Sequence, residues 1–186
     1  MFWHGLGESG NGTTELNKVL KNGIPRLIEK GEKFDAIVIS PQTTPWPKTE
    51  DLVAFFNYIL EKYKDKIDTN RIYITGLSMG GRNTLILARA IPDKIAAIVP
   101  ICPADNNPGD VSAMKNMGIW FFHNEGDNVV NVSSSKTWCD ALKNAGATPK
   151  LTIYNAKGHD AWSKTYDDRE MWKWLFDQKL KITEKK

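Results

Sequence analysis

Ser78 is the side chain of this chain best suited to covalent chemistry. It lies between two glycines in Gly76-Leu77-Ser78-Met79-Gly80, directly after the strand-like run 71–75. A serine in this spacing, where a strand meets a helix, is typical of a tight turn that exposes a nucleophilic hydroxyl. The turn also points the Met79 N–H toward the place where an oxyanion would form. Because an ordinary glycine-rich turn shows the same pattern, the rest of the chain has to decide.

A serine hydroxyl needs a base, usually a histidine held by a carboxylate. The chain has three histidines, His4, His123 and His159. In hydrolases that alternate strands and helices the order is serine, acid, histidine, which excludes His4. His123 ends the apolar run 119–122 and is expected to be a hydrogen-bonded histidine near the core. His159, in a loop after the strand-like run 151–154, is the predicted base, and its alternative is a solvated loop histidine.

The acid is expected between Ser78 and His159, just past a strand. Asp127 in Asn124-Glu125-Gly126-Asp127-Asn128-Val129-Val130 fits, because Gly126 allows a sharp turn and the two valines can seal the carboxylate from water. A desolvated aspartate bound to one imidazole nitrogen fixes the tautomer and stabilises the imidazolium. Glu125 is the rival from the same loop, and Asp105 and Asp110 follow an earlier strand.

A second glycine-rich loop, His4-Gly5-Leu6-Gly7-Glu8-Ser9-Gly10, follows the short apolar start of the chain. Such a loop can present backbone N–H groups to a cleft. The amide of Leu6 is the predicted second oxyanion donor beside that of Met79. Glu8 is expected to brace this loop. A nucleotide-binding function is disfavoured, since no Gly-Lys-Ser/Thr follows and the dinucleotide spacing is absent.

These motifs together resemble the α/β-hydrolase superfamily, and within it the esterases grouped with phospholipase/carboxylesterase and polyhydroxybutyrate-depolymerase-like enzymes. The matching segments span nearly the whole chain and stand in the expected order: 4–10, Ser40-Pro41-Gln42, 76–81, Gly126-Asp127 and Gly158-His159-Asp160-Ala161-Trp162. The resemblance implies ester hydrolysis through Ser78, Asp127 and His159, without a cofactor. It leaves the ester itself open.

Two features depart from the family pattern. Such enzymes usually have one or more strands before the first glycine loop, and here only Met1-Phe2-Trp3 corresponds to them. We therefore expect N-terminal edge strands to be missing, either because the sequence is a truncated one or because the protein has lost an edge hairpin. Relatives often carry an aromatic residue after the double glycine, where this chain has Arg82. The second departure concerns local packing more than chemistry.

Composition favours one globular domain over residues 1–186. The chain is 41% hydrophobic with a net charge of +3, too little for a nucleic-acid partner, and it has no apolar run near the ~20 residues that span a bilayer. The start lacks the plan of a secretion signal. Secreted, periplasmic and cytoplasmic locations all stay open, as does the oligomeric state.

Cys102 and Cys139 are too few for a disulfide framework, and buried free thiols are expected. A single bridge stays open for an exported protein. Neither has a histidine or cysteine at ligand spacing, so no metal site is expected.

Hydrophobic periodicity predicts the elements that must position these groups. Apolar runs predict about six strands, at 1–3, 35–40, 71–75, 95–101, 118–123 and 150–154. Helical stretches are expected between them, at about 14–30, 49–65, 80–91, 133–146 and 164–179. This alternation predicts an α/β fold with a mostly parallel sheet and helices on both faces.

Three side chains are candidates for substrate contact. Trp46, stiffened by prolines on both sides in the loop 41–47, can form a wall for an acyl or sugar group, and Trp162 is a second candidate wall. The alternatives are packing of Trp46 on its own loop and packing of Trp162 that fixes the His159 loop. Gln42 can offer its amide.

The sequence thus predicts a serine carboxylesterase. An open cleft without a lid favours small or polymer-attached esters, such as acetyl or feruloyl groups of plant polysaccharide. A lysophospholipase or thioesterase of the same fold and a non-catalytic binding module are the alternatives, whereas a peptidase of the prolyl-oligopeptidase kind would need a gating domain.

Overall fold

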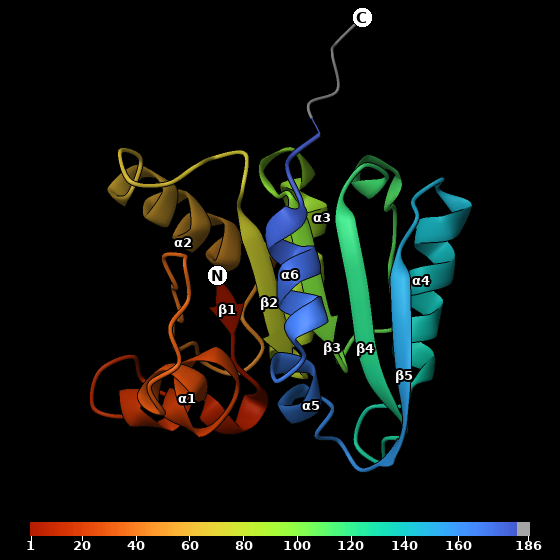
Figure 1. Cartoon of the computed structure of the whole chain (residues 1–186), viewed down its shortest axis with the longest axis horizontal. Coiled ribbons are helices and arrows are strands. Elements are labelled where there is room, and N and C mark those ends of the chain that lie inside the picture. Colours follow the sequence, from red (N-terminus) through yellow and green to blue (C-terminus); the bar gives the residue numbers. More distant parts are fainter. Residues whose placement is uncertain (182–186) are drawn as a thin grey trace, which may run out of the picture.

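The structure is a computed structural model that describes residues 1–181. Its sheet has five parallel strands in the order β1 to β5. They are β1 (Phe2–Trp3), β2 (Tyr73–Leu77), β3 (Ala97–Ile101), β4 (Gly118–Gly126) and β5 (Lys150–Lys157). Their carboxyl ends all point to the lower edge in Figure 1, so the loops that follow the strands gather there. This is the edge at which such sheets carry their ligands.

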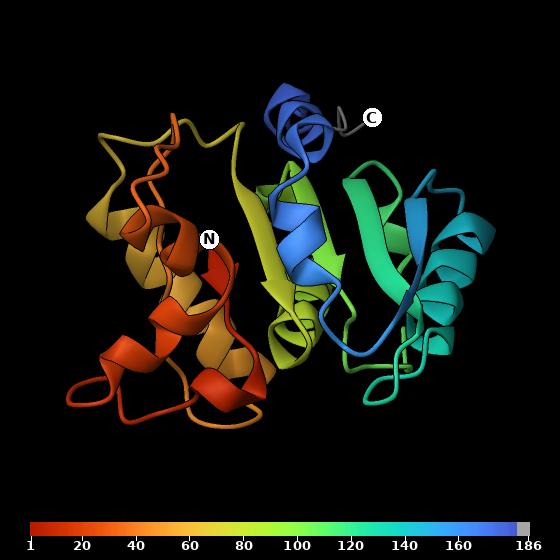
Figure 2. The ribbon, with the colours of Figure 1, turned by 60° about the horizontal axis from the view of Figure 1, so that its bottom comes forward.

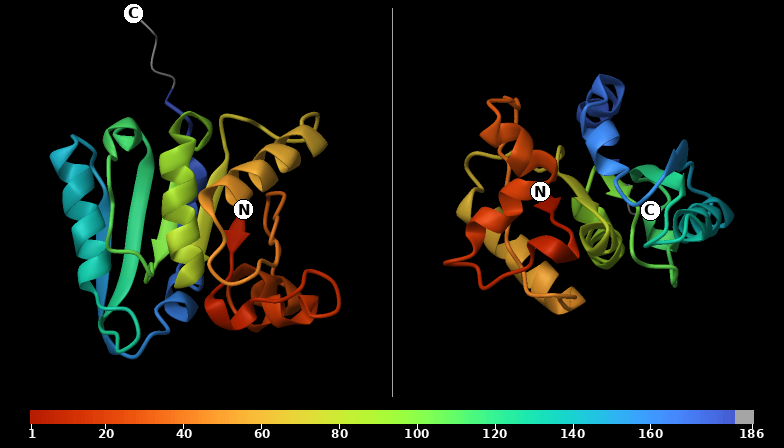
Figure 3. Two further views of the ribbon diagram at one scale, coloured as in Figure 1. Left: turned by 180° about the vertical axis from the view of Figure 1, so that it is seen from behind. Right: turned by 90° about the horizontal axis from the view of Figure 1, so that it is seen from below.

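Helices cover both faces of the sheet. On one face lie α2 (Thr49–Lys62), α3 (Met79–Ala90) and α4 (Ser133–Asn144), seen from behind in Figure 3. On the other lie α1 (Gly23–Glu29), α5 (Trp162–Tyr166) and α6 (Arg169–Asp177), of which α6 crosses the front of the sheet in Figure 1. Parallel strands with a helical connection between most neighbours make the predicted α/β architecture.

The core has two halves, one on each face of the sheet. Strand side chains alternate between the faces, so Trp3, Ile74 and Ile98 join α2, α3 and α4 in one cluster. Phe2, Val99 and Phe122 join α1, α5 and α6 in the other. The two halves clamp the sheet and thereby fix the positions of its strand ends.

The expected strand at 35–40 is wrong, and so is the count of about six. This segment runs beside β1 without forming a ladder, and its recorded bond to that strand is Phe2 N–H to the Ile39 carbonyl at 2.9 Å. Because β1 spans two residues, it offers too short an edge for regular pairing. Ile37 accordingly stays exposed instead of packing into the sheet.

Two predicted helices are interrupted. The stretch 14–30 splits into a 3₁₀ helix (Leu16–Lys21) and α1, with Gly23 at φ 64° where the second begins. The stretch 164–179 splits into α5 and α6, because Asp168 caps a new helix by accepting the Glu170 N–H. Among the described residues, no helix combines the length and hydropathy needed to cross a bilayer.

Candidate active site

Ser78 occupies a strained turn between β2 and α3. Its backbone has φ 56° and ψ −116°, in the region that side chains other than glycine rarely adopt. The turn is held from both sides, since the Ser78 N–H donates to the Ile101 carbonyl at 2.9 Å and its carbonyl accepts from Ala104 at 3.1 Å. The serine therefore projects from the carboxyl edge of the sheet with a fixed backbone.

The glycines around Ser78 are required by close backbone contacts. A Cβ on Gly76 would lie 2.4 Å from the Gly80 carbonyl oxygen, and one on Gly80 would lie 2.0 Å from that of Trp3. Only glycine lets α3 approach β1 and β2 this closely. Met79 begins α3, so its N–H lies at the positive end of the helix dipole, where an oxyanion is stabilised.

Asp127 and His159 form the central polar pair of the site. The His159 Nδ1 and Asp127 Oδ2 atoms are 2.6 Å apart, and the Asp127 side chain is fully buried. The other carboxylate oxygen, Oδ1, accepts the N–H groups of Val129 and Val130 at 2.8 and 3.0 Å. Glu125, the alternative acid, is exposed to solvent.

The contacts of Asp127 keep its carboxylate ionised. Burial by itself would raise its pKa, but the hydrogen bonds from His159, Val129 and Val130 outweigh burial and lower the pKa below the ordinary value. The expectation that valine side chains seal the carboxylate is wrong for Val129, a residue that is 68% exposed. The valines act on Asp127 through their backbone amides.

The other ring nitrogen of His159, Nε2, is buried and has no hydrogen-bond partner within residues 1–181. Ser78 therefore makes no hydrogen bond to it.

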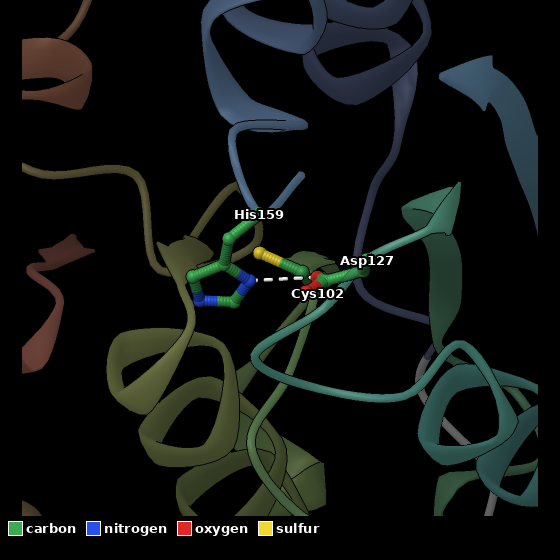
Figure 4. A group of neighbouring side chains, drawn as sticks. All are labelled: Cys102, Asp127 and His159. Carbon is green, nitrogen blue, oxygen red and sulfur yellow. Dashed lines mark hydrogen bonds and ion pairs between the residues drawn. The ribbon is translucent and has the colours of Figure 1, made fainter. Parts of the chain in front are cut away.

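Cys102 lies beside the Asp127–His159 pair, since its Sγ is within 4.8 Å of the nearest carboxylate oxygen and ring nitrogen of these residues. It directly follows Ile101, whose carbonyl accepts the Ser78 N–H. Figure 4 shows the thiol beside the paired carboxylate and imidazole. With the bottom of the molecule turned forward, Figure 2 shows the segment after β5 passing the strand ends toward α5.

Cys102, Asp127 and His159 are also residue types that bind metals, a combination that the sequence spacing did not reveal. The structure favours proton chemistry, however. Asp127 uses both oxygens to accept N–H groups, and burial raises the pKa of the Cys102 thiol far above its ordinary value. A metal would have to displace the Asp127–His159 hydrogen bond and a tightly held thiol proton.

The first glycine loop is braced by Glu8, as the sequence predicts. The Glu8 side chain, in a buried residue, accepts the Gly5 N–H at 2.7 Å and the Asn22 Nδ2–H at 2.6 Å. Asn22 in turn accepts the Trp162 Nε1–H at 3.2 Å. Leu6, the predicted oxyanion donor, begins a 3₁₀ helix (Leu6–Glu8) directly after the braced glycine.

The remaining two histidines have different tasks. His4 bridges two loops, with Nδ1 2.7 Å from the Gly5 carbonyl and Nε2 accepting the Thr43 N–H at 2.9 Å. His123 is fully buried and hydrogen-bonded through both nitrogens, which confirms the expectation of a core histidine.

The three side chains predicted to contact substrate differ in how far other residues of the protein engage them. The Gln42 amide is engaged by the Glu8 and Glu15 carbonyls and by the Gly12 N–H, which favours a bracing role over substrate contact. Trp162 packs edge to face against His159, with centroids 5.3 Å apart, which supports the alternative that it fixes the His159 loop. Trp46 is 48% exposed.

Trp46 is held close to the turn that carries Ser78. Its backbone has φ 52°, and its N–H donates to the Met79 sulfur at 3.2 Å. The Arg82 guanidinium lies 6.0 Å from its ring and donates to the Pro47 carbonyl at 3.3 Å. Arg82 thus packs on the Trp46 loop, in line with the expectation that its effect is local.

Several residues of the site carry no signal in the sequence. Asn22 stands in no distinctive motif, and Asn124, which donates to the Gly158 carbonyl at 2.9 Å, belongs to the end of β4, where the sequence predicts a loop. The sequence predicts Cys102 at a strand end but does not reveal that it lies beside the His159 imidazole. A cavity of about 420 Å³ elsewhere, lined by Phe34, Val38, Tyr73 and Phe176 among others, contains none of the predicted site residues.

The parallel sheet, the strained serine at its carboxyl edge and the paired aspartate and histidine define an α/β-hydrolase. The chain belongs to the phospholipase/carboxylesterase family, which matches residues 49–174, and members of this family are serine hydrolases that act on carboxylic esters.

Individual relatives agree with this class. The bifunctional acetylxylan esterase/xylanase XynS20E of Neocallimastix patriciarum is 39% identical over 102 residues, which cover 51% of this chain and 15% of that protein. Acyl-protein thioesterase 1 of Neurospora crassa is 26% identical over 201 residues, covering 90% and 82%. The crystal structure of a thermostable esterase has a TM-score of 0.74 at 31% identity, covering 96% of this chain and 54% of that one. The chain thus spans 15% of the first relative and about half of this esterase.

Proposed function

We propose that this protein is a serine carboxylesterase that works through Ser78, His159 and Asp127. The 2.6 Å hydrogen bond between Asp127 and His159, at the sheet edge that carries the strained Ser78, supports this proposal most directly. The buried Nε2 of His159, which has no hydrogen-bond partner in the described part of the chain, is the atom suited to accept the serine proton. Hydrogen bonds between base and nucleophile are often long in free enzymes and shorten when substrate binds.

The reaction has two halves. Ser78 Oγ attacks the acyl carbon while its proton passes to His159 Nε2, and the Met79 and Leu6 amides stabilise the oxyanion. The ester C–O bond breaks, and the His159 proton goes to the leaving alcohol. Water then attacks the acyl-enzyme in the same way, which releases the acid and restores Ser78. Asp127 keeps the imidazole in the required tautomer throughout. Loss of one oxyanion donor is expected to reduce kcat by about 10²–10³.

Esters on plant polysaccharide, acetyl groups above all, are the proposed substrate class. The support is the matching segment of an acetylxylan esterase/xylanase and the exposed Trp46, whose flat ring can stack on a sugar. A thioesterase is the second candidate, favoured by the match to acyl-protein thioesterase 1 over 90% of this chain. Turnover of acetylated xylan, feruloyl sugar esters, p-nitrophenyl esters of increasing chain length and acyl thioesters would separate the two.

A fluorophosphonate probe tests the chemistry itself. We expect the wild-type protein to be labelled and Ser78→Ala to be neither labelled nor active, because no other hydroxyl stands in the nucleophile turn. Ser163→Ala is the matched control, since that hydroxyl bonds to Asp160; this variant should be labelled like the wild type. A folded wild type that resists labelling would instead support a non-catalytic binding module.

A further inference from the structure

His123 makes a contact that a merely structural core histidine would not need. Its Nε2 lies 2.9 Å from the Val130 carbonyl and 3.2 Å from Asp127 Oδ2, the same oxygen that His159 approaches. Both of these neighbours only accept hydrogen bonds at this point. The Nε2 atom therefore carries the proton and shares it between them.

The hydrogen bond at the other ring nitrogen, Nδ1, is consistent with this tautomer. Nδ1 of His123 lies 2.8 Å from the hydroxyl of Ser135, a buried residue of α4. Because Nδ1 is unprotonated in this tautomer, the hydroxyl donates and the ring accepts. One imidazole thus joins the end of β4, the Asp127 loop and the first turn of α4.

Four N–H nitrogen atoms therefore lie within 3.2 Å of the Asp127 carboxylate, two beside each oxygen. Val129 and Val130 donate to Oδ1, while His159 and, at 3.2 Å, His123 face Oδ2. Three of these donors fix where the carboxylate lies, and the fourth, His159, is the group that it orients. Removing the His123 donor would leave Oδ2 without a partner on the side away from His159.

Burial also keeps the His123 imidazole neutral beside the charged Asp127 carboxylate. It lowers the pKa of the His123 imidazole, although the Val130 carbonyl and the Asp127 charge act in the opposite direction. Asp127 and His159 are the charged or titratable groups that act on this ring most strongly. A neutral donor orients the carboxylate and leaves its negative charge for the imidazolium of His159.

We propose that His123 is a positioning residue that orients Asp127, and through it His159, for the esterase reaction. The proposal rests on the proposed function. It predicts that the Nε2 donor of His123 controls kcat, because a displaced general base loses about 10²-fold in rate. The Nδ1 contact to Ser135 should matter mainly for stability.

Two amide substitutions distinguish the role of Nε2 from that of Nδ1. The amide of His123→Gln can place an N–H where Nε2 lies, whereas the shorter side chain of His123→Asn reaches only the position of Nδ1. With p-nitrophenyl acetate, we expect His123→Gln to keep kcat within a few-fold and His123→Asn to lose about 10²-fold, with KM little changed in both. Chemical denaturation should rank the two differently, because Gln loses the Ser135 contact. Equal kcat values, or kcat values that follow stability, would overturn the proposal.

A double-mutant cycle shows whether His123 acts through Asp127. In the Asp127→Ala background, His123→Asn should reduce kcat no further. Independent losses that add would contradict the proposal. If Asp127→Ala alone left turnover unchanged, the proposed function would be at fault instead.

A spectroscopic readout works even without turnover. The proton shared by His159 Nδ1 and Asp127 Oδ2 should give a far-downfield ¹H resonance in the wild type and in His123→Gln, and a shifted or lost one in His123→Asn. Should both His123 variants fail to fold, Ser135→Ala removes the Nδ1 contact alone. Because the Nε2 donor remains, this variant is expected to lower the free energy of unfolding and to keep the resonance. Ser134→Ala, whose hydroxyl binds the Pro103 carbonyl, is the matched control for loss of a buried hydroxyl on α4. Loss of the resonance in Ser135→Ala alone would show that the α4 contact, and not the Nε2 donor, positions Asp127, and would reject the proposal.

Discussion

Asp127 shows how a buried charge is tolerated at the scale of one residue. Its side chain is fully buried, yet every neighbour at hydrogen-bond distance is an N–H donor. Such donors compensate for the lost hydration and favour the ionised form. Glu125, two residues earlier, is exposed and lacks this cage. Loop position, more than residue type, therefore distinguishes the two carboxylates.

The lowered pKa of Asp127 makes stability depend on pH. In the folded state this pKa lies below its ordinary value, so the ionised carboxylate contributes stability above the unfolded pKa of about 3.9. That contribution is lost as the pH falls through the folded value. We expect the free energy of unfolding of the wild type to exceed that of Asp127→Asn at pH 7, and the gap to narrow below about pH 4.

Urea denaturation between pH 7 and pH 3 measures this gap. Glu125→Gln is the control, and its curve should run parallel to that of the wild type because the side chain is exposed. A gap between wild type and Asp127→Asn that stays constant over this range would show that Asp127 is not selectively stabilised in its ionised form.

At the scale of elements, the turn that carries Ser78 depends on how closely α3 approaches β1. A Cβ at position 80 would meet the Trp3 and His4 carbonyl groups, which are backbone and cannot rotate away. We expect Gly80→Ala to destabilise the protein by about 1–3 kcal/mol through overpacking, and to reduce activity by displacing Ser78. Thermal or chemical denaturation measures the stability loss.

Gly7→Ala is the matched control for stability. A Cβ at this position has no atom within 4 Å, and the residue lies within the 3₁₀ helix Leu6–Glu8 without a positive φ. Its unfolding free energy should stay within about 0.5 kcal/mol of the wild type. Equal losses in the two variants would mean that close packing at the turn is not what requires Gly80.

The elements were predicted from sequence to different degrees, for physical reasons. Five strands follow from apolar runs, although β5 is largely exposed where a buried strand is expected. The glycines of the Ser78 turn follow from their spacing. The segment 35–40 has the same apolar pattern, but the strand beside it, β1, is two residues long, which the pattern does not show. Likewise, the position of Asp127 and His159 in loops after strands predicts them as site residues. The contact of His123 with Asp127 depends on how β4, the Asp127 loop and α4 pack together, which the sequence pattern does not show.

At the scale of the whole molecule, the candidate site lies at the carboxyl edge of the sheet, between the two halves of the core. Ser78, Asp127 and His159 come from segments that follow β2, β4 and β5, and the parallel arrangement brings these strand ends to one side. Cys102, after β3, fills the space among them and is fully buried. The packing that joins the strands therefore also closes the floor of the site.

This closure predicts how the two thiols of the chain react. Cys102 and Cys139 are free and buried, and burial raises the pKa of both thiols, so neither offers an accessible thiolate. At pH 8 we expect a thiol reagent to modify neither cysteine in the native protein and both cysteines in denaturant. Labelling of the native protein should proceed only through opening of the structure, at a rate that rises with mild denaturant. Rapid native labelling of one thiol, identified as Cys102 by peptide mapping, would show that the floor of the site opens readily beside the Asp127–His159 pair.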